Sequence, residues 1–166
     1  KIYLGSDEMW TIPESEPKIP HLSNNFIVVI GRWQEYKNMH NALRALLTFK
    51  GDKRLSNYQV IFLGKSNIER KTSKIINQLL RKFPKNKIIA IDFLPYQELK
   101  WVYANSSLVI FPSINEGFGI PAFEAFGEGA KILVHASTPA AQILTSQVGV
   151  YSENLIDVEA FSTALN

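Results

Sequence analysis

The sequence of 166 residues contains no cysteine. This absence excludes disulfide bonds, zinc held by thiolates and catalysis by a thiol nucleophile. The chain also lacks an Asp-x-Asp pair, an acidic clamp for a divalent ion on phosphate, and we expect no metal and no other cofactor. His21, His40 and His135 stand alone, and their spacing indicates neither a metal site nor a catalytic dyad.

Long apolar runs are also missing. No run reaches the roughly 18 residues of a membrane span, and the N-terminus lacks the pattern of a secretory signal, so we expect a cytoplasmic protein. With 46% apolar and 20% charged residues, the chain has the composition of one globular domain. Its 18 basic residues only slightly exceed its 15 acidic ones, and this excess does not indicate a nucleic-acid partner.

The first 25 residues differ in composition from the rest of the chain. Pro13, Pro17 and Pro20 lie among polar residues there, which favours an extended linker. From residue 26 onward, helical patterns alternate with short apolar runs: "FIVVI", "YQVIFL", "KIIAI", "SLVIF" and "KILV". Strands that are apolar throughout and separated by helices predict an α/β fold, a Rossmann-like three-layer sandwich with a parallel sheet.

Charged residues follow two of the expected strands. Arg32 and Lys37 come after "FIVVI", and Glu116 comes after "SLVIF". Open parallel sheets bind ligands in the crevice beyond the carboxyl ends of their strands, so these side chains are expected to meet there. A guanidinium and an ammonium at such a loop can neutralise a diphosphate without a metal.

The segment after Glu116 favours close approach of a ligand. The glycines of residues 117–119 let the backbone lie against a bound molecule, and Pro121 suits the first position of a helix whose free N–H groups attract anions. Glu124 is expected in the first turn of that helix, where interaction with the helix dipole is its simplest explanation. Glu116 has no comparable structural explanation.

Two other motifs fail on inspection. "GKS" at residues 64–66 resembles the end of a P-loop, but Gln59 stands where the first glycine is required. "GFGIPA" matches a dinucleotide fingerprint, but Ser137 stands where that fingerprint needs an acid. Neither an ATPase nor a dehydrogenase is supported.

A basic helix face is expected at residues 68–83. It could make peripheral contact with an anionic membrane surface, although a solvated face is the simpler interpretation. Its basic residues are Arg70, Lys71, Lys74, Arg81 and Lys82.

Four stretches together resemble a known family. "IGRWQEYKN" resembles its Gly-Arg and Lys-Asn loop, and "FPSINEGFGIPAFEA" resembles its motif of two glutamates separated by seven residues. "FLPYQELKWVYANSSLVIFPS" resembles the segment before that motif, and "KIYLGSD" resembles the strand that enters the domain. The chain is thus similar to the C-terminal, nucleotide-sugar-binding domain of retaining glycosyltransferases of family four, or group one. This resemblance implies one half of a GT-B architecture.

The resemblance implies a role for each matching residue. Arg32 and Lys37 would hold the diphosphate and stabilise charge on the leaving group, and Glu116 would bind donor-sugar hydroxyls near the reacting carbon. Glu124 would bind the ribose. The remaining expected contacts are the sugar pocket at Gly117, Phe118 and Gly119, the base contacts Phe93 and Leu94, and the nucleotide contacts Gly31, Gly64 and Lys65.

The implied reaction is transfer of a sugar from a UDP-, GDP- or ADP-linked donor, with retention, in bacterial surface polysaccharide or other glycan synthesis. Residues 1–25 would form the lead-in strand and linker, and residues 26–166 the donor-binding domain. A glycan or lipid-linked glycan acceptor would bind an N-terminal domain absent from this chain, so we expect donor binding without efficient transfer. The intact enzyme would work in the cytoplasm, where peripheral contact with the inner face of the membrane is open to it.

Two alternatives remain open. The chain could be a nucleotide-binding or regulatory module without catalysis, or part of a sugar-nucleotide epimerase with the same two-domain plan. The two-glutamate motif disfavours the epimerase, because that motif matches the transferases.

Overall fold

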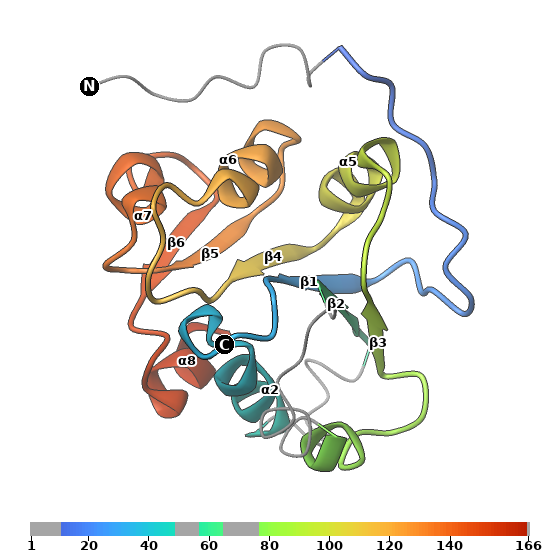
Figure 1. The fold of residues 1–166 in the computed structure, drawn as a ribbon, viewed down its shortest axis with the longest axis horizontal. Coiled ribbons are helices and arrows are strands. Elements are labelled where there is room, and N and C mark those ends of the chain that lie inside the picture. Colours follow the sequence, from blue (N-terminus) through green and yellow to red (C-terminus); the bar gives the residue numbers. More distant parts are fainter. Residues whose placement is uncertain (1–10, 49–56, 65–76, 166) are drawn as a thin grey trace.

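The computed structural model describes residues 11–48, 57–64 and 77–165. Within these residues, six parallel strands form a sheet in the order β3-β2-β1-β4-β5-β6 (Figure 1). The strands are β1 (Phe26–Ile30), β2 (Gln59–Leu63), β3 (Ile88–Ile91), β4 (Leu108–Phe111), β5 (Ile132–His135) and β6 (Val150–Glu153). The order reverses between the neighbours β1 and β4, which defines a doubly wound sheet with its switch point there.

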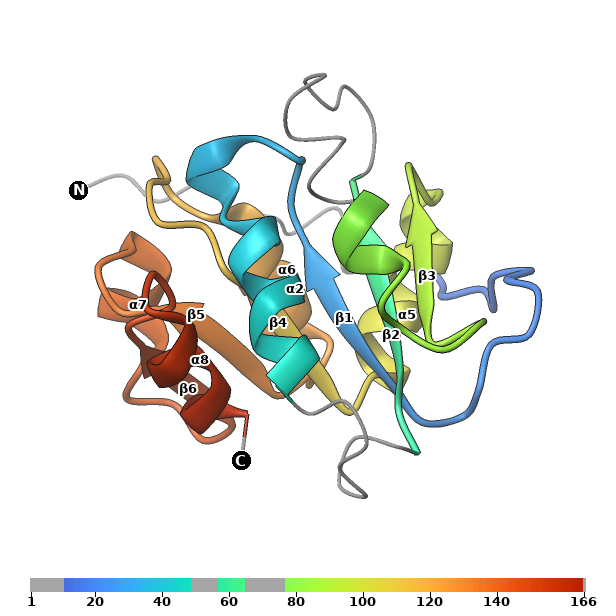
Figure 2. The ribbon, with the colours of Figure 1, turned by 90° about the horizontal axis from the view of Figure 1, so that it is seen from below.

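Helices cover both faces of this sheet (Figures 1 and 2). One face carries α5 (Tyr96–Asn105), α6 (Ile120–Gly127) and α7 (Pro139–Leu144), and the other carries α2 (Met39–Thr48) and α8 (Val158–Ala164). The predicted Rossmann-like three-layer fold is therefore confirmed.

The central strands are apolar throughout because they contribute to two cores. In β1, Phe26 and Val28 pack into the core under α5, α6 and α7, whereas Ile27 and Val29 pack into the core under α2 and α8. Successive side chains of a strand point to opposite faces, so a central strand covered on both sides must be apolar at every position. Runs such as "FIVVI" follow from this requirement.

The lead-in segment has no helix or strand in its described part, residues 11–25, as its prolines predict. Two hydrogen bonds attach it to α5. The Ser15 N–H donates to the Gln97 carbonyl at 3.0 Å, and Lys100 Nζ donates to the Ile12 carbonyl at 2.8 Å. The linker therefore lies along the surface of the domain. The lead-in strand implied by "KIYLGSD" lies outside the described residues.

The sixth strand, β6, is absent from the sequence-based prediction. Its residues alternate between buried and exposed: Val150 is buried and Tyr151 is exposed. It is an edge strand of the sheet that the described residues form, and polar residues are tolerated at such an edge. The apolar runs used to recognise the central strands could not detect it.

The basic helix face expected at residues 68–83 is only partly described. Arg70, Lys71 and Lys74 lie outside the described residues, whereas Arg81 and Lys82 are exposed. In the part of the chain that the structure covers, no helix is long and apolar enough to cross a membrane.

Candidate functional site

The predicted charged residues meet at the switch point of the sheet. The loop after β1 forms a short 3₁₀ helix, η1 (Glu35–Lys37), and its neighbour β4 is followed by the loop that carries Glu116. A backbone hydrogen bond of 2.9 Å from the Ile114 N–H to the Tyr36 carbonyl joins the two loops. Residues far apart in the sequence are thus held at one edge of the sheet.

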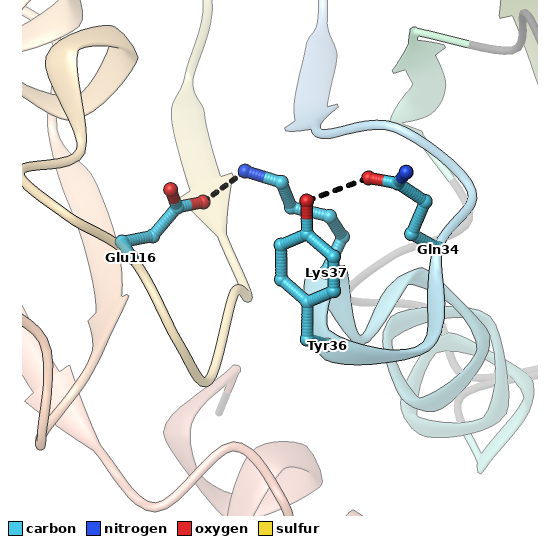
Figure 3. A network of polar contacts seen from close by, with 4 residues as sticks. All are labelled: Gln34, Tyr36, Lys37 and Glu116. Carbon is cyan, nitrogen blue, oxygen red and sulfur yellow. Dashed lines mark hydrogen bonds and ion pairs between the residues drawn. The ribbon is translucent and has the colours of Figure 1, made fainter.

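Lys37 and Glu116 form an ion pair across the switch point (Figure 3). Lys37 Nζ donates a hydrogen bond to Glu116 Oε1, and the two side chains are only 16% and 13% exposed. The same ammonium lies 5.2 Å from the centre of the Tyr36 ring and 6.0 Å from that of Phe111, close enough for cation–π attraction. The Tyr36 hydroxyl in turn donates to Gln34 Oε1 at 2.7 Å. A carboxylate and two aromatic rings therefore hold this ammonium in place.

Arg32 lies at the same edge and has no polar partner within the part of the chain that the structure describes. Its side chain is exposed. An unpaired guanidinium beside a shielded ammonium can bind an anion with two oxygen atoms.

A cavity of about 400 Å³ opens beyond the carboxyl ends of the first four strands. It brings together six of the residues predicted to line the site, namely Gly31, Arg32, Lys37, Gly64, Phe93 and Leu94. Phe93 is 79% exposed, which leaves its ring available for stacking on a flat ligand. Lys65 lies outside the described residues.

Four further cavity residues matter to the site and were not predicted. They are Tyr36, Asp92, Leu99 and Phe111, whereas Pro121, which was expected at a helix start beside the ligand, also lines the cavity. Asp92 directly follows β3, so the rule that ligands bind beyond the carboxyl ends of parallel strands could have found it. Tyr36 had no such signal, because it lies inside a loop whose 3₁₀ turn the sequence does not reveal.

Gly64 is required by a close approach between two loops. Its φ is +100°, and a Cβ built on it would lie 2.6 Å from the Gly31 carbonyl oxygen. The ends of β1 and β2 can therefore touch only because residue 64 has no side chain.

The glycines after Glu116 have different explanations. Gly119 has a φ of +88°, and a Cβ there would lie 3.1 Å from Phe111 Cε1, so the fold itself favours glycine. Gly117 has no atom within 4 Å of such a Cβ, so packing within the described chain does not require glycine there. Phe118 stacks on Phe123, with ring centres 4.5 Å apart. None of residues 117–119 lines the cavity itself.

Glu124 differs from its prediction in one respect. It is the fifth residue of α6, and the first turn of that helix holds no acidic residue. The prediction that Glu124 lies in the first turn, where it would interact with the helix dipole, is therefore wrong. Its carboxyl is half-buried, and this desolvation raises its pKa. Burial, and then the charge of Glu124, raise the pKa of Tyr96 and Tyr103 on α5. Glu124 therefore faces α5, and it does not line the cavity.

No group of three or more metal-binding side chains occurs in the part of the chain that the structure covers. The buried His135 accepts a hydrogen bond at Nδ1 from the Leu155 N–H at 3.1 Å, and burial lowers its pKa. His40 also has a lowered pKa, caused first by burial and then by Arg44. Both rings have structural surroundings rather than partners for catalysis.

Fold and site together define a class of protein. A doubly wound sheet with a cavity, two cations and glycine-containing loops at its switch point is the arrangement with which α/β domains bind ligands beyond their strand ends. The chain belongs to the family of glycosyl transferases group 1, whose family model matches residues 12–166.

Similar proteins agree with this family. The O-antigen chain mannosyltransferase RfbU of Salmonella typhimurium is 23% identical over 141 residues, which are 85% of this chain and 37% of RfbU. The sucrose-phosphate synthase of Thermosynechococcus elongatus superposes with a TM-score of 0.72 at 17% identity, over 87% of this chain and 36% of the synthase.

A UDP-forming trehalose-phosphate synthase from Burkholderia xenovorans gives a TM-score of 0.69 at 14% identity, over 85% of this chain and 35% of that protein. The chain thus spans little more than a third of the length of each of these three proteins. The expected half of a GT-B architecture is confirmed at the level of the fold.

Proposed function

We propose that this chain is the donor-binding half of a retaining glycosyltransferase. It would bind a nucleoside-diphosphate sugar, and the complete enzyme would pass the sugar to a glycan or lipid-linked glycan on an N-terminal domain. The observation that carries this proposal is that Arg32 and Lys37 line the switch-point cavity together, with Glu116 paired to Lys37 although it does not itself line the cavity. Cations suit the diphosphate and a carboxylate suits sugar hydroxyls, so the three groups match the two ends of such a donor.

The diphosphate is assigned to Arg32 and Lys37. Arg32 has no partner in the described chain, and Lys37 has only Glu116, so a diphosphate can bind both cations once Glu116 turns away. The same cations would stabilise the charge that develops on the departing nucleoside diphosphate. Glu116, released from Lys37, would accept hydrogen bonds from the donor sugar.

The remaining residues are assigned around this anion site. Phe93 and Leu94 would contact the base, and Gly31 and Gly64 would admit the nucleotide backbone. Gly117, Phe118 and Gly119 would shape the sugar pocket, Glu124 would bind the ribose, and Lys65 would lie near the nucleotide. The lack of any packing requirement for glycine at residue 117 supports close approach of a ligand there.

We also propose the pathway in which the complete enzyme works. The name of RfbU places that protein in O-antigen synthesis, which supports a role in bacterial surface polysaccharide synthesis for this chain. The Burkholderia synthase is UDP-forming, which supports a nucleoside diphosphate as the leaving group. We propose reaction without a metal, in the cytoplasm or at the inner face of the membrane.

Calorimetric titration of this chain with UDP, GDP and ADP tests the proposal. At least one should bind, and Lys37→Ala should weaken that binding about tenfold or more, because a hydrogen bond to a charged group contributes about 1.5–3 kcal/mol. Arg81→Ala, which removes an exposed cation outside the cavity, should leave the affinity unchanged. Failure of all three nucleotides to bind the folded chain, or equal binding by Lys37→Ala, would contradict the proposal.

In the complete enzyme, Arg32→Ala should lower the rate on the order of 100-fold, the effect of losing one preorganised donor. Transfer at the parental rate would show that Arg32 does not stabilise the leaving group.

A further inference from the structure

Asn38, the residue after Lys37, is a buried polar residue at the joint between two helices. It is only 2% exposed, and its φ of 58° is a left-handed conformation that asparagine tolerates better than most residues. Its N–H donates to the Glu35 carbonyl at 3.0 Å, and its carbonyl accepts from the Asn41 N–H at 3.1 Å. Asn38 therefore ends η1 and begins α2.

The side chain of Asn38 reaches a distant part of the chain. Its Nδ2 donates to the Leu155 carbonyl at 2.7 Å, across 117 positions of sequence. Leu155 is fully buried between β6 and α8, and its N–H donates to Nδ1 of His135 at the end of β5. Asn38, Leu155 and His135 thus form one junction, here called the Leu155 junction, in which both polar groups of Leu155 are bonded to side chains.

We infer that Asn38 is a positioning residue for the diphosphate site, because it anchors the backbone of Lys37 to the Leu155 junction. This inference rests on the proposed function, which assigns a phosphate to Lys37. The segment η1 has three residues, and a 3₁₀ turn of this length has weak internal hydrogen bonds. External anchors must therefore fix where its side chains point.

Two anchors hold η1, one on each side of Lys37. On one side the Tyr36 carbonyl accepts from the Ile114 N–H at 2.9 Å, which connects η1 to the loop of Glu116. On the other side the Asn38 amide binds Leu155. Without the second anchor, Lys37 can follow Glu116 instead of staying at the cavity edge, and the ammonium no longer meets the diphosphate at a fixed position.

Asn41 offers a matched control three residues later. Its Nδ2 donates to the Ile156 carbonyl at 3.0 Å, so it makes the same kind of bond to the residue next to Leu155. It lies on α2 rather than at the end of η1, and it is also buried. Loss of this bond should affect stability as loss of the Asn38 bond does, but should not move Lys37.

The experiment compares Asn38→Gly with Asn41→Ala in this chain. Glycine keeps the left-handed backbone of residue 38 and removes only the amide anchor. Affinity is measured by calorimetry with whichever of UDP, GDP and ADP binds the parent chain. Each substitution is measured both in the parent chain and in a chain that also carries Lys37→Ala. Amide hydrogen exchange is followed at residues 37 and 38, whose N–H groups close η1 by donating to Gln34 and Glu35.

Asn38→Gly should weaken nucleotide binding about fivefold, as expected for losing one hydrogen bond, and Asn41→Ala should change it less than about twofold. Added to Lys37→Ala, Asn38→Gly should have no further effect, because the ammonium that it positions is already gone. Exchange at residues 37 and 38 should become faster in Asn38→Gly and not in Asn41→Ala.

The inference is overturned if Asn38→Gly binds the nucleotide as tightly as the parent chain does. It is also overturned if Asn38→Gly weakens nucleotide binding by the same factor in the Lys37→Ala variant as in the parent chain. If the parent binds none of the three nucleotides, the proposed function fails, and the exchange rates alone decide whether Asn38 fixes the backbone of Lys37. If the parent binds and Lys37→Ala weakens binding while Asn38→Gly does not, the proposed function stands and this inference fails.

Discussion

Substitution of Gly64 by alanine tests the packing that creates the cavity. The new Cβ would lie 2.6 Å from the Gly31 carbonyl oxygen and 3.3 Å from the Arg32 nitrogen, both backbone atoms. These atoms cannot rotate away as a side chain would. The loops after β1 and β2 must separate, although the Gly31 N–H is bonded to the Leu63 carbonyl at 3.1 Å and the Gly64 N–H to the Ile91 carbonyl at 2.9 Å.

The expected loss of stability has two parts. A side chain in the left-handed region costs about 1–2 kcal/mol, and forcing an extra methyl into a packed site costs about 1–3 kcal/mol. The free energy of unfolding should therefore fall by roughly 2–5 kcal/mol, and Tm by roughly 4–20 °C for a domain of this size. The loss is measured by urea denaturation followed by circular dichroism.

Gly129→Ala is the control that separates these two parts. Its φ is +80°, but a Cβ there would have no atom within 4 Å, so only the backbone term of about 1–2 kcal/mol applies. Equal stability of Gly64→Ala and Gly129→Ala would refute the claim that the loops of β1 and β2 touch at residue 64.

Three further predictions concern charged and titratable groups. Glu116→Gln should tighten the binding of a nucleoside diphosphate without sugar about threefold to tenfold in calorimetry, because the phosphate no longer competes with the Glu116 carboxylate for Lys37. Unchanged or weaker binding would contradict this competition. Glu124→Gln should raise the free energy of unfolding at pH 7, because burial raises the pKa of this carboxyl and its ionised form opposes folding. This gain in the free energy of unfolding should shrink as the pH falls toward 4.5, because the carboxyl is then protonated in both states. A gain that does not change with pH would show that ionisation of Glu124 is not its cause. The lowered pKa values of His40 and His135 predict full stability above pH 6.5 and a Tm that falls as the pH drops below it. In His135→Gln, Tm should fall less steeply with pH; an equally steep fall would exclude His135 as a contributor.

Much of the fold could be predicted because the central strands leave a strong signal. Strands buried on both faces must be apolar at every residue, and "FIVVI" or "SLVIF" has few other interpretations. The strand β6 lies at the edge and alternates between buried and exposed residues, so its short polar sequence resembles a loop. The rule that ligands bind beyond the carboxyl ends of parallel strands then predicted that Arg32 and Lys37 lie together, and both line one cavity.

The contacts within the site could not be predicted in the same way. The pairing of Lys37 with Glu116 depends on how two loops separated by 79 positions turn toward each other, and no local pattern encodes that distance. The start of α6 at Ile120 moved Glu124 out of the expected first turn. Phe118 stacks on Phe123, a contact that depends on the turn between them. Such details arise from tertiary packing rather than from residue type or spacing.

The proposed function requires that a nucleoside diphosphate bind between the loops that follow β1 and β4. The most direct measurement is a titration of the ¹⁵N-labelled chain with UDP, GDP and ADP, followed through its backbone amide shifts. We expect the largest shifts on Gly31, Arg32, Lys37 and Gly64, which line the cavity. Shifts centred on α2 and α8, or no shift with any of the three nucleotides, would contradict it.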